Sequence, residues 1–162
     1  MKQNVPKIDI YYRARRLANI LVWTIDLQVH RLKSEESKDK EFVFRRWADF
    51  EFLVIALIRL RKIANLIVKE IKTTKDIIEP AIKEFDKNLP NLKKVRDVTL
   101  HIDDYAMDNG RLDDVSRYEL EVGEFGDEEW NWLGCKINSS KAYSVSLQLF
   151  RAIQNSEKLI KK

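Results

Sequence analysis

Three residues in the stretch RDVTLH, residues 96–101, carry the side chains that acid–base chemistry on a phosphate group would use. Arg96 is followed directly by Asp97, and His101 comes five positions after the arginine. Histidine side chains titrate near neutral pH and can move a proton, whereas a guanidinium stabilises charge on phosphate oxygens. An aspartate beside an imidazole can fix its tautomer and orientation. Two interpretations follow: the three residues form a reaction centre, or they are neighbours on a solvated helix.

The segment that contains these residues runs from Pro90 to Met107 and is predicted to form one continuous helix. Positions four apart share a helix face, so Asp97, His101 and Tyr105 would lie in one row. The predicted inward stripe consists of Leu92, Val95, Thr99, Ile102 and Ala106. In a purely structural interpretation, an exposed Asp97–His101 pair contributes roughly a few tenths of a kcal/mol and no activity.

The string RDVTLH resembles the R-x-x-x-x-H signature of HEPN domains, in which a polar residue such as Asp commonly follows the arginine. Members of that family are small helical bundles, and many are metal-independent endoribonucleases. The resemblance implies RNA as substrate and a homodimer whose two motifs meet in a cleft. It also implies that Arg96 clamps a phosphate, that His101 acts as base or acid, and that Asp97 orients the histidine.

One position departs from a HEPN subtype, and a longer pattern resembles other proteins. Some HEPN toxins carry a tyrosine two residues after the histidine, where this chain has Asp103. This difference counts against the subtype that is regulated by nucleotidyltransferases. The string LPNLKKVRDVTLHIDDYAMDNGR, after a helix that contains ADFEFLVIALIRLRK, also resembles bacterial proteins with no assigned activity.

Four further residues are candidates for binding. Tyr105 belongs to the row described above, and Asp49, Arg59 and Lys62 lie in a long, mostly apolar segment. A polar residue on a largely buried helix usually has a partner, so Asp49 is expected to pair with an arginine or to line a cleft. We predict no metal site and no cofactor, because the chain lacks a phosphate loop and clusters of Cys and His.

The composition indicates one helix-rich globular domain over residues 1–162. Hydrophobic residues make up 44% of the chain and charged residues 35%, with few glycines and prolines. The single cysteine, Cys135, excludes an intramolecular disulfide. The N-terminal residues lack the apolar region of a secretion signal, and the longest apolar run, residues 52–58, is too short for a membrane span. We therefore expect a cytoplasmic protein with no membrane association.

Charge is distributed unevenly along the chain. Residues 1–72 hold 16 Lys and Arg against 9 Asp and Glu, a net charge of +7, whereas residues 73–162 carry −3. Residues 103–129 alone carry −9. A basic half is compatible with binding phosphates, although solvated helix faces of mixed charge explain most of these residues better. The acidic stretch argues against wrapping nucleic acid over the whole surface.

The periodicity of apolar residues predicts a mainly α fold, a bundle of four to five helices with a short β-hairpin before the C-terminal helix. Helices are expected over residues 10–33, 42–72, 74–88 and 90–107. The first is predicted to bury Leu17, Ile20, Leu21, Thr24, Leu27 and Leu32. Residues 108–114 should end the fourth helix, with Asn109 and Gly110 as its C-cap. The hairpin appendage is expected over residues 116–137, with strands at 116–122 and 129–137. Trp130 and Trp132 alternate in the second strand and are expected to pack on one face rather than to stack on bases. Asn138 or Ser139 would then cap the last helix.

Two functions are compatible with these features. The first is a HEPN-like, RNA-associated homodimer, a metal-independent endoribonuclease of toxin or defence type controlled by a protein regulator. The second is a non-catalytic helical module that binds another protein, in which Arg96, Asp97 and His101 form a structural network. A catalytic site requires His101 in a basic cleft that is open to solvent and close to Arg96.

Overall fold

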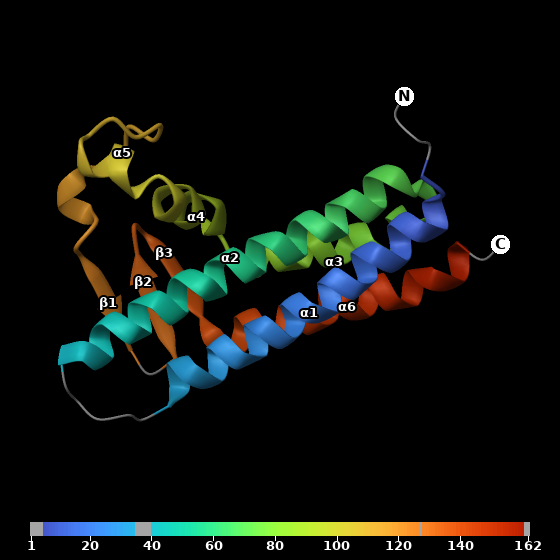
Figure 1. Ribbon diagram of the computed structural model, residues 1–162, viewed down its shortest axis with the longest axis horizontal. Coiled ribbons are helices and arrows are strands. Elements are labelled where there is room, and N and C mark those ends of the chain that lie inside the picture. The colour runs from blue at the N-terminus through green and yellow to red at the C-terminus, as the bar shows by residue number, and fades with distance from the viewer. Residues whose placement is uncertain (1–4, 35–39, 127, 161–162) are drawn as a thin grey trace.

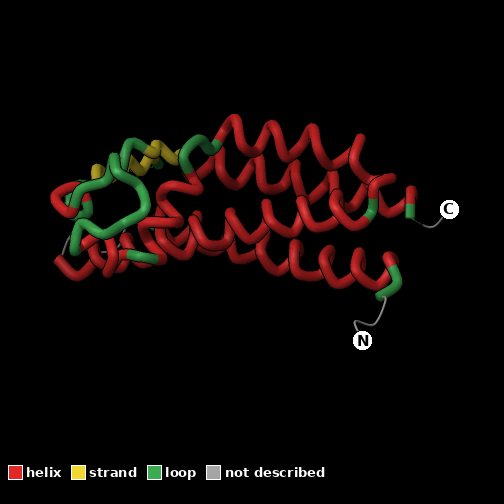
Figure 2. Tube along the Cα trace, turned by 90° about the horizontal axis from the view of Figure 1, so that it is seen from above, coloured by secondary structure: helices red, strands yellow, loops and turns green. Residues whose placement is uncertain are grey.

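The computed structural model describes residues 5–34, 40–126 and 128–160, and within it four helices form an elongated bundle. The bundle helices are α1 (Lys7–Lys33), α2 (Lys40–Glu70), α3 (Lys75–Asn88) and α6 (Ser139–Asn155) (Figure 1). The helices α1 and α2 form an antiparallel hairpin, and α6 packs against both α1 and α3. Figure 2 shows the helices lying along the long axis, with strands and loops gathered at one end. The predicted mainly α fold is confirmed.

The buried face of α1 differs from the predicted one. Of the predicted stripe only Leu32 is buried, whereas Leu17, Ile20 and Leu27 are each more than half exposed. The helix instead buries Tyr11, Ala14, Ala18, Val22, Ile25, Val29 and Leu32. The prediction was wrong because apolar residues occupy two opposite faces of α1, and each face has helical spacing. The face that contains the two small alanines became the buried one, since small side chains permit close helix packing.

The remaining residues, 90–138, form a second region at one end of the bundle, which we call the cap. Its helices are α4 (Leu92–Leu100) and α5 (Ile102–Ala106), separated at His101. The predicted continuous helix is therefore wrong, because His101 has φ −127° and ψ 36°. Two acidic residues, Asp103 and Asp104, follow the break in the first turn of α5, where carboxylates stabilise a helix start.

The chain leaves α5 through Asp108, which has a positive φ of 55°. The N–H of Asn109 then donates to the carbonyl of Asp104 at 2.9 Å, closing the helix end. The prediction that Asn109 and Gly110 form this C-cap is wrong by one to two residues. Gly110 has a different role, because a Cβ there would lie 2.1 Å from the ring of Tyr105.

The strands of the cap form an antiparallel sheet in the order β1 (Gly123–Phe125), β2 (Glu129–Trp132) and β3 (Cys135–Asn138). The predicted strand at residues 116–122 is wrong, since a 3₁₀ turn, η2 (Arg117–Glu119), lies there. β1 occupies the segment that was predicted to be the hairpin loop. The true tight turn is Leu133–Gly134, whose φ values of 53° and 69° suit a two-residue hairpin connection.

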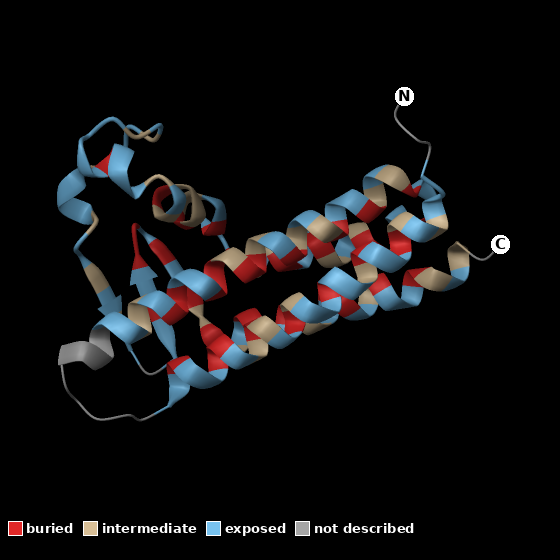
Figure 3. Ribbon diagram, viewed as in Figure 1, coloured by how far each residue is buried: buried red, intermediate tan, exposed pale blue. Residues whose placement is uncertain are grey.

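An aromatic cluster joins the sheet to α2. Trp130 stacks on Phe50 of α2 with ring centroids 4.9 Å apart, and Trp132 meets Trp47 edge-on at 5.2 Å. Both tryptophans of β2 are buried, as the alternating pattern predicted. Figure 3 shows buried residues along the facing sides of the bundle helices and on strands of the sheet. Asn138 caps α6 by accepting a hydrogen bond from the N–H of Lys141 at 2.9 Å. The cap is thus fixed to the bundle at both α2 and α6.

Two short 3₁₀ turns complete the described elements, η1 (Lys72–Thr74) before α3 and η3 (Ser156–Leu159) after α6. None of the helices in the described part of the chain combines the length and apolar character that crossing a bilayer requires.

Candidate functional site

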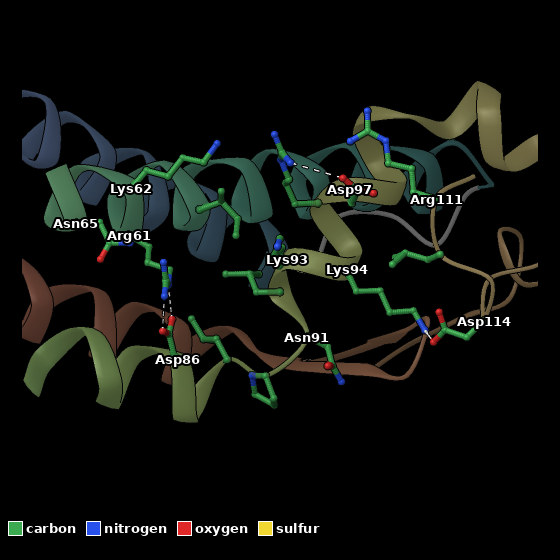
Figure 4. Close-up of a pocket in the computed structure, with 16 residues that line it drawn as sticks. Arg61, Lys62, Asn65, Asp86, Asn91, Lys93, Lys94, Asp97, Arg111 and Asp114 are labelled. Carbon is green, nitrogen blue, oxygen red and sulfur yellow. Dashed lines mark hydrogen bonds and ion pairs between the residues drawn. The ribbon is translucent and has the colours of Figure 1, made fainter. Parts of the chain in front are cut away.

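A cleft of about 980 Å³ lies where the bundle meets the cap. Its walls come from the middle of α2, the end of α3, the first turns of α4 and residues 111–114 (Figure 4). Six cationic side chains line it: Arg61, Lys62, Lys93, Lys94, Arg96 and Arg111. Three carboxylates line it as well, so the formal charge of the lining is about +3.

The connection between α3 and α4 holds one wall of the cleft in place. Asn91 adopts a left-handed conformation, with φ 62°, directly before α4. The thiol of Cys135 in β3 donates to the carbonyl of Pro90 at 3.1 Å, and burial raises the pKa of this thiol to about 11. The sheet therefore anchors the start of the helix that carries Lys93, Lys94 and Arg96.

Each carboxylate in the cleft is engaged by a cation. Arg61 donates two hydrogen bonds to Asp86, at 2.5 and 2.6 Å, in a bidentate pair between α2 and α3. Lys94 donates to Asp114 at 2.7 Å and thereby lowers the pKa of that carboxyl group. Asp97 lies 3.7 Å from the guanidinium of its neighbour Arg96. These three pairs leave no carboxylate in the lining to balance the other cations.

Among the residues that the structure describes, Lys62, Lys93 and Arg111 have no ion-pair partner. Figure 4 shows Lys62 on α2 and Arg111 on the segment after α5, on two sides of the cleft, with α4 between them. Lys62 and Arg111 come from positions 49 residues apart in the sequence. The fold thus gathers unpaired positive charge from separate segments in one concave surface, which attracts an anionic ligand.

The predicted motif is divided between two environments. Arg96 and Asp97 line the cleft, and their side chains are 27% and 17% exposed. Asp97 accepts a hydrogen bond from the hydroxyl of Tyr105 at 3.2 Å. Burial and this neighbouring carboxylate raise the pKa of Tyr105, whose ring is buried in the cap. Tyr105, predicted to bind a ligand, therefore supports Asp97 from within the core.

His101 does not line the cleft. It lies at the break between α4 and α5, where the imidazole Nδ1 is 3.7 Å from a carboxylate oxygen of Asp104. The predicted Asp97–His101 pairing depended on an unbroken helix, and the break changes the direction of the chain at that residue. Within one chain, the structure brings Arg96 and Asp97 together and leaves His101 outside.

The other predicted binding residues are also separated. Lys62 lines the cleft, whereas Arg59, one turn earlier on α2, is exposed and not part of the lining. Asp49 is buried and pairs with Arg31 of α1 at 2.8 Å, which confirms a pairing with an arginine. This ion pair helps to fix the α1–α2 hairpin and lies outside the cleft.

Sequence reasoning did not assign a binding role to the cleft residues Arg61, Lys93, Lys94 and Arg111. The adjacent lysines Lys93 and Lys94, beside Arg96, were a visible signal of local positive charge. Arg111 gave no such signal, because it lies in the acidic stretch of the sequence. In the described part of the chain, no three His, Cys, Asp or Glu side chains converge as metal ligands do.

Comparison with protein-family models, with curated proteins and with solved structures gave no match. The HEPN resemblance in residues 96–101 therefore stays a prediction, and the proposals below depend on the geometry of the cleft.

Proposed function

We propose that the chain is an RNA-associated protein that binds the phosphate backbone of single-stranded RNA in the cleft around Arg96. The observation that carries the proposal is the set of cations without ion-pair partners, Lys62, Lys93 and Arg111, in one concave surface. Phosphate contacts by Lys and Arg supply most of the sequence-independent affinity for nucleic acid. Arg96 adds a guanidinium that can engage a phosphate with two donors.

RNA is favoured over a small anion for two reasons. The cleft volume of about 980 Å³ is at the upper end for pockets that hold a single small ligand. The HEPN resemblance of Arg96 and its neighbours also implies RNA. The acidic residues of the cap, such as Asp103 and Asp104, repel phosphates and would limit the bound strand to the cleft.

The test is fluorescence anisotropy of a labelled single-stranded RNA oligonucleotide, titrated with protein in EDTA at several salt concentrations. With about three or four phosphates neutralised, the logarithm of the binding constant should fall against the logarithm of salt with a slope of roughly −2 to −3. Lys62→Ala and Arg111→Ala should each weaken binding and reduce that slope by about 0.7.

Arg59→Ala is the matched control, because it removes a cation from the exposed side of the same helix as Lys62. Its affinity for RNA and its salt slope should equal those of the unmodified protein. Absence of RNA binding at low salt would refute the proposal. Equal losses for Arg59→Ala and Lys62→Ala would also refute it, because they would indicate general attraction to a basic protein.

Metal-independent RNA cleavage is a second candidate function, and the surroundings of His101 favour it. The imidazole is partly exposed, and the large apolar residues on both sides of it, Leu100 and Ile102, are 49% and 46% exposed. Exposed apolar residues at a helix junction are typical of a contact surface. A second copy that covers them would bring its own His101 toward this region, as the family resemblance implies for a two-fold dimer.

Cleavage is tested by incubating total RNA with the protein in EDTA, beside His101→Ala and Arg96→Ala. A ribonuclease of this kind requires both residues, so each change should abolish cleavage while circular dichroism shows an intact fold. Cleavage that survives both changes would rule out this centre. Binding without cleavage would support RNA association and leave His101 with a structural role.

A further inference from the structure

The outer face of the α1–α2 hairpin carries large apolar side chains that the protein does not bury. On α1 these are Leu17, Ile20, Trp23 and Leu27, each between 52% and 64% exposed. Single exposed apolar residues are common on protein surfaces, but four within eleven positions of one helix form a contiguous patch. We call this patch the α1 stripe. It lies opposite the buried alanine face of the same helix.

The α1 stripe has the spacing of a helix-pairing surface. Leu17, Ile20, Thr24 and Leu27 follow one another at intervals of three, four and three residues, as do the a and d positions of a coiled coil. The patch continues onto α2. The Arg31–Asp49 ion pair fixes the antiparallel register of the hairpin, and it places Leu27 and the exposed Phe52 at the same level.

Most of the charges around the α1 stripe are positive, although Asp9 of α1 and Glu51 of α2 are exposed acids. Arg13 and Arg16 precede it on α1, and Arg59 of α2 lies at the level of its centre. All three are exposed, and none has an ion-pair partner among the residues that the structure describes. Over the whole of α1, residues 7–33, the sequence has six Lys and Arg and two acids. One acid is Asp9, which is exposed one turn before Arg13, and the other is Asp26, which faces α6 through Tyr143.

From this combination we propose that the α1 stripe is a docking surface for an amphipathic helix of a partner protein, with an apolar seam flanked by Glu or Asp. The apolar seam would pack on Leu17, Ile20 and Leu27, and the acidic flanks would pair with Arg13, Arg16 and Arg59. A second copy of this chain on the same face would oppose arginines to arginines. The surface lies on the outer side of the hairpin and shares no residue with the lining of the proposed RNA-binding cleft.

The probe is a synthetic peptide of about three heptads with Leu at a and d and Glu at e and g, compared with the same peptide carrying Lys in place of Glu. Like charges at e and g keep each peptide from pairing with itself. Calorimetric titration of the full chain should give binding of the Glu peptide, stronger than binding of the Lys peptide by about tenfold or more at low salt.

Three variants localise the binding. Ile20→Asn with Leu27→Asn should abolish it, because both polar substitutions lie on exposed positions and leave the core intact. Arg13→Glu with Arg16→Glu should reverse the preference, so that the Lys peptide binds more tightly. Val122→Asn is the matched control, because Val122 is also an exposed apolar residue, at 68%, and lies in the cap. It should bind the Glu peptide like the unmodified chain.

Four results would overturn the proposal. One is no binding of the Glu peptide, and another is equal binding of both peptides. The third is a concentration-dependent dimer, in analytical ultracentrifugation, that Ile20→Asn with Leu27→Asn dissociates, since a second copy would then occupy the surface. The fourth is binding to anionic phosphatidylglycerol vesicles without binding to the peptide, which would assign the surface to a lipid headgroup layer.

Discussion

The bundle and the cap are built by different means. Aliphatic stripes repeated along α1, α2, α3 and α6 hold the bundle together, and no described residue within it has a positive φ. The cap depends on individual contacts. All residues with positive φ in the described chain, namely Asn91, Asp108, Leu133 and Gly134, lie in it. Periodic patterns therefore specify the bundle, whereas single residues at fixed positions specify the cap.

The candidate site depends on both regions. The bundle contributes α2 and the end of α3 to the walls of the cleft, and the cap contributes α4 and residues 111–114. The cleft forms only where the two regions meet, with Arg61 and Lys62 on one side and Lys93 and Arg111 on the other. Sites at the junction of two structural regions are common, because such junctions leave concave surfaces.

The largest expected effect comes from the aromatic contact that joins the two regions. Trp130→Ala should lower the free energy of unfolding by about 3–5 kcal/mol, because it leaves a cavity beside Phe50. Trp23→Ala, on the exposed α1 stripe, should change it by less than about 0.5 kcal/mol. Urea denaturation followed by circular dichroism measures both. Similar losses of stability for the two variants would contradict the burial of Trp130 and the exposure of Trp23.

The second prediction concerns the pH dependence of the cap. Burial raises the pKa of Cys135 from 9.0 to about 11, so the folded state keeps the thiol protonated at a pH where the unfolded chain ionises. The resulting stabilisation is complete below pH 9 and is lost as pH rises toward 11. Between these values the free energy of unfolding should fall by about 2–3 kcal/mol more in the unmodified protein than in Cys135→Ala. Parallel pH profiles for both proteins would show that the thiol is not buried.

A third comparison uses two glycines of the cap. Gly110→Ala should destabilise the protein by about 1–3 kcal/mol, since the new Cβ would overlap the ring of Tyr105 at 2.1 Å. Gly126→Ala is the control, because its Cβ would have no neighbour closer than 3.6 Å. Thermal and urea unfolding of the two variants tests whether individual close approaches specify the cap. If both variants were equally stable, the close contact between Gly110 and Tyr105 would not help to specify the cap.

The smallest effect is expected at the hydrogen bond beneath the cleft. Tyr105→Phe removes the donor to Asp97 and should cost about 1 kcal/mol of stability. RNA affinity should stay unchanged, because the Tyr105 hydroxyl is buried and touches Asp97 rather than the cleft surface. A large loss of RNA affinity with little loss of stability would instead give Tyr105 the binding role that its sequence position predicted.

The sequence predicted the elements that local patterns encode. Helical spacing located α1, α2, α3 and α6, and the alternation of Trp130 and Trp132 located β2. The predictions were wrong at His101, where the helix breaks, and over residues 116–125, where tertiary contacts decide the conformation. The η2 turn at Arg117–Glu119 and the short strand β1 lack a periodic signal, and β1 depends on pairing with β2 and on the packing of Phe125 against Trp47.

For the candidate site, the sequence pointed to Arg96, Asp97 and Lys62, all of which line the cleft. It did not predict that His101 would lie outside the cleft. Whether His101 lies with Arg96 depends on the direction in which the chain leaves α4, and a helical wheel assumes that this direction does not change. Arg111 was overlooked for a related reason. Its charged neighbours in the sequence are mostly acidic, whereas in space it shares the cleft with lysines from α2 and α4.

By itself, the sequence determined a mainly α chain with an apolar α2, a basic first half and an acidic stretch from residue 103 to residue 129. Only the tertiary structure decided which apolar face of α1 is buried and which cations share a cleft. Helical periodicity arises from contacts within a few residues, so it is visible in a short window. The choice between two apolar faces, and the meeting of Lys62 with Arg111, depend on packing between distant segments.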